Sequence, residues 1–142
     1  MKRFMLIGKT SAGKTTLCQR LHDAEIMYKK TQSVEIYNYA IDTPGEYIEN
    51  RIYYRALVVT SADADIIALV QEATEDRSFF PPGFASIFAK EVIGIITKSD
   101  RADKQEELDR AQEFLKEAGV SRVFKISAYT GEGLEELTAY LT

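Results

Sequence analysis

The sequence predicts an α/β domain in which helices cover both faces of a mostly parallel sheet of about five strands. The first observation is that short apolar runs alternate with longer segments of helical pattern along the 142 residues. The second is that several of these runs, such as 66–70, lack polar residues, which is typical of strands buried on both faces. Right-handed crossovers would bring the carboxyl ends of these strands to one edge of the sheet, where ligands bind.

The first half of the chain is expected to hold three strands and two helices. Residues 3–8 (RFMLIG) form a compact apolar run, and residues 14–23 carry a helical pattern. A second strand is expected at 34–41 (VEIYNYAI), followed by a helix at 47–60 and a third, continuously apolar strand at 65–70. This order of elements is the one that a parallel sheet with helical crossovers requires.

The second half repeats the same alternation. Pro81 and Pro82 suit the entrance of a helix expected at 83–90. Gly119 is placed to end the charged amphipathic helix expected at 104–118. The remaining expected elements are the strands 91–97 (EVIGIIT) and 122–126 and the closing helix 133–141.

Composition excludes several classes of protein. With 45% hydrophobic residues, only three Pro and eight Gly, residues 1–142 are expected to form a single globular domain. The longest apolar runs are too short to cross a bilayer, so we expect a soluble, cytoplasmic protein with no membrane partner. One Cys and one His cannot build a soft-metal cluster, and a net charge of −4 argues against a nucleic-acid partner.

The stretch GKTSAGKT, residues 8–15, matches the phosphate-binding pattern G-x-x-x-x-G-K-[ST] in full. Gly8 and Gly13 would let backbone N–H groups surround phosphate oxygens at the start of a helix, whose dipole is positive there. Lys14 is expected to bridge the β- and γ-phosphates, and the Thr15 hydroxyl to coordinate Mg²⁺. The other candidate nucleotide contacts in and after this loop are Lys9, Ser11, Ala12 and Thr16, of which Lys9 and Ser11 could instead face only solvent. The competing interpretation of the whole stretch is a Gly-rich turn before a helix.

A second motif, DTPG at residues 42–45, follows the second expected strand. Asp42 could hold Mg²⁺ through a water molecule, and the Gly45 N–H could contact a γ-phosphate. A four-residue D-x-x-G pattern is also common in ordinary turns. Its placement at the same sheet edge as the phosphate-binding loop is what favours a role in a nucleotide site.

Two further motifs follow the last two strands. In TKSD, Thr97 and Lys98 lead to Asp100, whose carboxylate can accept both N1–H and N2–H₂ of guanine, a pair of donors that adenine lacks. Ser127 and Ala128 follow the final strand, where the Ala128 N–H could meet the guanine O6. Each motif alone is weak, but all of them are expected at one edge of the sheet.

In this order the four motifs resemble those of the small P-loop GTPases over essentially the whole chain. Within that superfamily, the combination of GKTSAGKTTL, KKTQSVEIY and IDTPGEY resembles the EutP/PduV family of ethanolamine and propanediol utilisation. Only 27 positions separate Thr15 from Asp42, so the resemblance implies a P-loop NTPase sheet in which the additional edge strand of small GTPases is reduced or absent. It also implies Mg²⁺, GTP or GDP as ligands, with ATP an alternative, and microcompartment shell or enzyme proteins as partners.

Two residues are candidates for the hydrolytic step. The family resemblance of KKTQ makes Thr31 the candidate switch threonine over Mg²⁺ and the γ-phosphate, with an exposed loop residue as the equal alternative. Many GTPases have a water-orienting Gln directly after D-x-x-G, but this chain has Glu46. A carboxylate is repelled by a γ-phosphate unless it is screened or protonated, so slow hydrolysis is expected.

Three functions remain compatible with these motifs. The first is a GTP-dependent switch or slow GTPase, favoured by TKSD, although Tyr129 replaces the Lys of the usual Ser-Ala-Lys. The second is an acetate kinase, an activity that the family resemblance also implies. The third is a binding scaffold that does not hydrolyse nucleotide. The segment RSFFPPGF at 77–84 could either dock a partner or fold back over the core.

Overall fold

A computed structural model describes residues 2–29 and 39–142 of this chain. Five strands form one parallel sheet in the order β2-β1-β3-β4-β5. These strands are β1 (Phe4–Ile7), β2 (Ala40–Asp42), β3 (Ile66–Glu72), β4 (Glu91–Thr97) and β5 (Val123–Lys125). The parallel five-stranded sheet confirms the predicted α/β fold, and within the described residues no antiparallel strand joins it.

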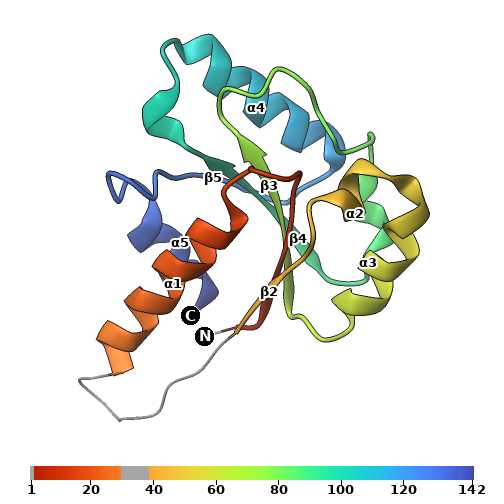
Figure 1. The fold of residues 1–142 in the computed structure, drawn as a ribbon, viewed down its shortest axis with the longest axis horizontal. Coiled ribbons are helices and arrows are strands. Elements are labelled where there is room, and N and C mark those ends of the chain that lie inside the picture. Colours follow the sequence, from red (N-terminus) through yellow and green to blue (C-terminus); the bar gives the residue numbers. More distant parts are fainter. Residues whose placement is uncertain (1, 30–38) are drawn as a thin grey trace.

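Helices cover both faces of the sheet, as Figure 1 shows. The α-helices are α1 (Lys14–Lys29), α2 (Glu46–Glu49), α3 (Tyr54–Ser61), α4 (Gln105–Ala118) and α5 (Leu134–Leu141), joined by the 3₁₀ turns η1 (Arg51–Tyr53), η2 (Phe84–Ile87) and η3 (Ser99–Arg101). The two ends of the chain lie close together, where the Lys2 N–H donates to the Leu141 carbonyl at 2.6 Å. No helix in the described part of the chain combines the length and apolar character needed to cross a membrane.

The core divides into two layers because successive side chains of a strand point to opposite faces. Met5 and Ile7 of β1 pack into a cluster with residues of α3 and α4, whereas Phe4 and Leu6 pack into a second cluster with α1 and α5. All four side chains are buried. Each face of the sheet is therefore held against helices, and the carboxyl edge between them remains for a ligand site.

Two predicted helices are shorter than expected. The segment expected to be helical at 47–60 breaks at Asn50, which adopts an extended conformation and whose side chain accepts a hydrogen bond from the Ile52 N–H at 3.1 Å. The segment expected at 83–90 forms only η2. Gly83 there is left-handed, and the turn inserts Phe84 into the core beside Phe80, so the RSFFPPGF segment folds back over the core.

Candidate functional site

The phosphate-binding loop connects the carboxyl end of β1 to the first turn of α1. Gly13 has a φ of +95°, a conformation that favours glycine, and a Cβ on Gly8 would lie 2.7 Å from the Val70 carbonyl oxygen. The Lys14 side chain is 7% exposed, and its Nζ donates to the carbonyls of Gly8 (2.7 Å) and Lys9 (3.0 Å). Burial lowers the pKa of Lys14, because the loss of surrounding water disfavours the charged ammonium. The loop thus holds a desolvated cation above a helix N-terminus.

Two oxygen groups meet beside this loop. Thr15 lies in the first turn of α1, and its hydroxyl donates a 2.9 Å hydrogen bond to Oδ2 of Asp42, the last residue of β2. Hard oxygen donors of this kind suit Mg²⁺, which usually takes only one or two protein ligands and completes its shell with water and phosphate. Among residues 2–29 and 39–142, no group of three or more acidic, His or Cys side chains could hold a metal alone. Thr15 and Asp42 therefore fit an ion that is bound together with a nucleotide.

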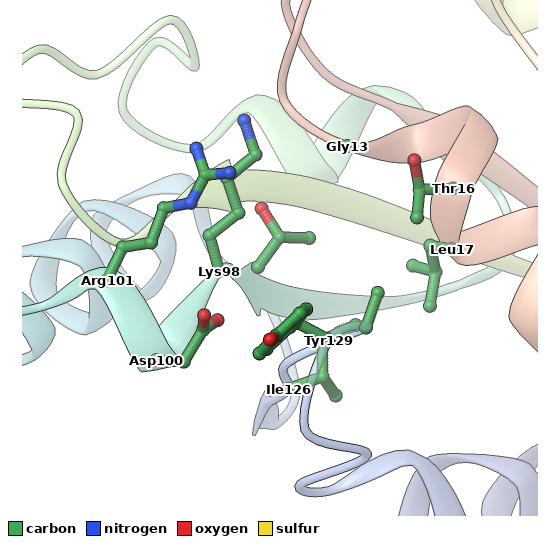
Figure 2. A pocket seen from close by; sticks show the side chains of 10 residues that line it. Gly13, Thr16, Leu17, Lys98, Asp100, Arg101, Ile126 and Tyr129 are labelled. Atoms are coloured by element: carbon green, nitrogen blue, oxygen red, sulfur yellow. The ribbon is translucent and has the colours of Figure 1, made fainter.

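A cavity of about 540 Å³ opens next to the same loop (Figure 2). Its walls come from the start of α1, the end of β4 with η3, and the loop after β5. The lining residues are Gly13, Thr16, Leu17, Thr97, Lys98, Asp100, Arg101, Ile126, Ala128 and Tyr129. Because residues of the phosphate-binding loop and of TKSD line one cavity, the geometry can accommodate a phosphate group and an attached planar base in one site.

The predicted base-recognition residues are held by short hydrogen bonds. Ser127 is fully buried, and its hydroxyl donates to Asp100 Oδ1 at 2.7 Å while accepting from the Thr130 N–H at 3.0 Å. Thr97 Oγ1 donates to the Ala12 carbonyl at 2.6 Å, which ties TKSD to the phosphate-binding loop. Ser127 therefore fixes the position of the Asp100 carboxylate, a contact that the spacing of the motifs alone does not reveal.

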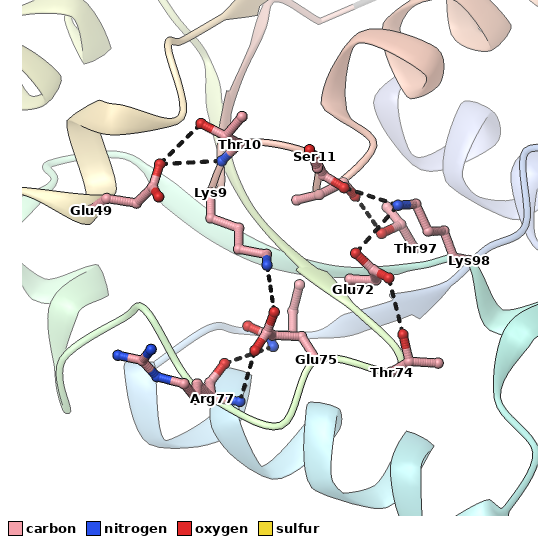
Figure 3. Close-up of polar contacts among 12 residues, drawn as sticks. Lys9, Thr10, Ser11, Glu49, Glu72, Thr74, Glu75, Arg77, Thr97 and Lys98 are labelled. Atoms are coloured by element: carbon pink, nitrogen blue, oxygen red, sulfur yellow. Dashed lines mark hydrogen bonds and ion pairs between the residues drawn. The ribbon is translucent and has the colours of Figure 1, made fainter.

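Two acidic residues, one at the end of β3 and one in the turn after it, complete this network, and the sequence motifs did not identify them. Lys98 Nζ contacts Glu72 Oε2 at 3.2 Å and donates to the Ser11 carbonyl at 2.9 Å, and Lys9 Nζ pairs with Glu75 at 2.5 Å (Figure 3). The hydrogen bond with Glu75 raises the pKa of Lys9, and the same bond lowers the pKa of Glu75. The Lys9 side chain thus connects the phosphate-binding loop to the turn that follows β3. The rule that ligand sites form at strand carboxyl ends was the available signal for Glu72 and Glu75.

The DTPG motif lies directly against the phosphate-binding loop. Glu49 Oε2 accepts from Thr10 Oγ1 at 3.0 Å and from the Thr10 N–H at 3.3 Å, so a carboxylate of α2 reaches a backbone donor of the loop. A Cβ on Gly45 would lie 2.6 Å from Thr10 Cα. Gly45 has an ordinary right-handed conformation, so this close approach is what requires glycine there.

The two residues predicted for hydrolysis remain predictions. Glu46 begins α2 and its side chain is exposed. Thr31 lies outside the described residues, as does most of the strand predicted at 34–41, of which β2 contains the last two residues.

Comparison with known proteins decides the family. Residues 1–142 match the family described as "PduV-EutP: Ethanolamine utilisation - propanediol utilisation". The chain belongs to the PduV-EutP family. It is 43% identical to the "Propanediol utilization protein PduV" of Citrobacter freundii, over 99% of this chain and 93% of that one. The "Probable acetate kinase EutP" of Escherichia coli is 33% identical, over 99% of this chain and 89% of its own length.

The chain is also similar to GTPase Era and to an elongation factor solved with a GTP analogue. The PduV-EutP chain is 31% identical to GTPase Era of Sinorhizobium medicae, over 96% of this chain but 50% of that protein. It superposes on the elongation factor SelB of Methanococcus maripaludis, solved with the GTP analogue GPPNHP, with a TM-score of 0.69 and 26% identity. That match covers 99% of this chain and 32% of SelB, so the chain spans about half of Era and a third of SelB. The predicted family and P-loop superfamily are therefore confirmed, and this PduV-EutP protein has a nucleotide-binding domain.

Proposed function

We propose that this PduV-EutP protein binds guanine nucleotides together with Mg²⁺ and acts as a slow GTPase or nucleotide switch. The observation that carries the proposal is the shared cavity: Asp100 and the phosphate-binding loop line one space, and Ser127 holds the Asp100 carboxylate in place. A fixed carboxylate can accept two hydrogen bonds from guanine and none of that kind from adenine. Mg²⁺, when bound, would neutralise phosphate charge, and Thr15 with Asp42 would hold it.

Binding should be measured by calorimetric titration of GTP, GDP and ATP in the presence of Mg²⁺. Asp100→Ala is expected to weaken GDP binding about 100-fold or more, since it removes two charge-assisted hydrogen bonds of about 1.5–3 kcal/mol each. Lys14→Ala should weaken all three nucleotides, because it removes the buried cation. The matched control is Asp103→Ala, which removes a neighbouring exposed carboxylate outside the cavity lining. A preference for ATP that survives Asp100→Ala would refute the guanine proposal.

Slow turnover follows from the chemistry of Glu46. An exposed carboxylate after DTPG can orient water less well than an amide beside the charged γ-phosphate. Single-turnover hydrolysis of GTP should therefore be slow in the native protein and faster in Glu46→Gln. Fast hydrolysis that is lost in Glu46→Ala would contradict this reasoning and show that Glu46 promotes hydrolysis.

The family description supports a place in ethanolamine or propanediol utilisation. We propose in addition a cytoplasmic location, with microcompartment proteins as partners. The name of the Escherichia coli relative, a probable acetate kinase, suggests phosphate transfer to acetate instead. The two activities separate in one assay with a radiolabelled γ-phosphate. Release of inorganic phosphate regardless of acetate supports the GTPase, whereas acetate-dependent formation of acetyl phosphate would support the transferase.

A further inference from the structure

Tyr129 is an unusual residue for its position. Its side chain is 90% exposed although it is a large aromatic group, and it is one of the residues that line the 540 Å³ cavity. Within the described parts of the chain, no hydrogen bond or ring contact holds it. Large aromatic rings are costly to leave in water unless something covers them. An incoming ligand in the cavity would meet this ring.

The loop that carries Tyr129 is firmly built. The Ser127 N–H donates to the Glu132 carbonyl at 3.0 Å, and the Gly131 N–H donates to the Ser127 carbonyl at 2.9 Å. Glu132 Oε1 also accepts from Ser99 Oγ at 2.7 Å, which joins this loop to η3 next to Asp100. The backbone under Tyr129 is thus fixed relative to the carboxylate that is proposed to read the base edge.

Lys98 contributes to the same cavity. Its backbone is left-handed, with a φ of 57°, and its Nζ is held by the Ser11 carbonyl and Glu72. With both ends of the side chain held, its four-carbon stem offers a defined apolar surface. Figure 2 shows the Lys98 stem, the Asp100 carboxylate and the Tyr129 ring around one space.

We propose that the Tyr129 ring stacks on the face of the nucleotide base, so that it supplies affinity while Asp100 supplies specificity. The proposal rests on the nucleotide-binding function proposed above. Every nucleobase has a π face, so stacking tolerates different bases, whereas hydrogen bonds to a base edge do not. Tyr129 stands where the usual Ser-Ala-Lys pattern has a Lys, and an aromatic ring there replaces an aliphatic stem with a larger flat surface.

The test is a comparison of two variants with two nucleotides, measured by calorimetry. Tyr129→Ala is expected to weaken GDP and inosine diphosphate by the same factor, about 5- to 100-fold, because base–aromatic stacking contributes roughly 1–3 kcal/mol. Tyr129→Phe should bind like the native protein. Asp100→Ala should instead change the ratio between the two nucleotides, since inosine lacks the N2 amino group.

A second measurement reads stacking directly. The native chain contains no Trp, so Tyr129→Trp introduces a single Trp, which can be excited selectively and whose emission should be quenched when GDP is added. Unchanged GDP affinity in Tyr129→Ala, or a loss confined to GDP and absent for inosine diphosphate, would overturn the stacking role. Either result would leave the proposed function intact if Asp100→Ala still weakens binding. Absence of any nucleotide binding by the native protein would overturn both proposals.

Discussion

The contact between Gly45 and Thr10 allows a quantitative prediction about how DTPG is held on the phosphate-binding loop. In Gly45→Ala the new Cβ would lie 2.6 Å from Thr10 Cα and 2.5 Å from Thr10 Oγ1, and closer still to Thr10 N. Two of these atoms belong to the backbone, so no rotamer change relieves the clash. Either the loop strains or α2 moves away, and movement would break both hydrogen bonds from Thr10 to Glu49.

The magnitude follows from these two costs. Overpacking of this kind costs about 1–3 kcal/mol, and the two exposed hydrogen bonds add up to about 1 kcal/mol. A domain of this length has an unfolding entropy of about 0.3 kcal/mol/K near its midpoint, so each kcal/mol lowers Tm by about 3 °C. Gly45→Ala should therefore melt roughly 3–12 °C below the native protein in the absence of nucleotide.

The assay is thermal and urea unfolding followed by circular dichroism, with Glu49→Ala as the companion variant. If Gly45→Ala has already displaced α2, adding Glu49→Ala should cost almost nothing more, so the two changes should be non-additive. Stability of Gly45→Ala within about 0.5 kcal/mol of the native value, together with full additivity, would refute the close packing of α2 on the loop.

Two further predictions concern single side chains near the site. Ser127→Ala should weaken GDP binding about 10-fold, because the Asp100 carboxylate stays but loses the hydroxyl that orients it. This loss should be smaller than that of Asp100→Ala when both variants are measured by calorimetry. Equal losses would contradict the positioning role of Ser127. Burial raises the pKa of the Cys18 thiol to about 12, so the reactive thiolate is only a small fraction of the side chain at pH 8 to 10. Its rate of alkylation by iodoacetamide should keep rising tenfold per pH unit between pH 8 and 10, whereas a plateau near pH 9, as for a free thiol, would show that Cys18 is not desolvated.

Much of the fold could be predicted because local sequence patterns carry it. The residues expected at 91–97 coincide with β4, whose centre is a continuous apolar run. The helix expected at 104–118 coincides with α4 to within one residue, because it is amphipathic and ends at Gly119. Prediction was poorer where tertiary contacts decide. Nothing local announces that Asn50 interrupts the segment at 47–60, or that Phe80 and Phe84 are drawn into the core.

The parallel α/β class, the phosphate-binding loop and the family resemblance could all be predicted from the sequence, because each depends on the types and spacing of neighbouring residues. The three-dimensional fold was needed to show that Ser127 holds the Asp100 carboxylate, that Lys98 and Lys9 pair with Glu72 and Glu75, and that Tyr129 lines the cavity. Those relations join residues far apart in the chain, such as Lys9 with Glu75 and Gly13 with Tyr129, and parallel strands bring them together only when the sheet forms. Spacing along the chain carries no information about such distances, so the residues that tune the site become visible only in three dimensions.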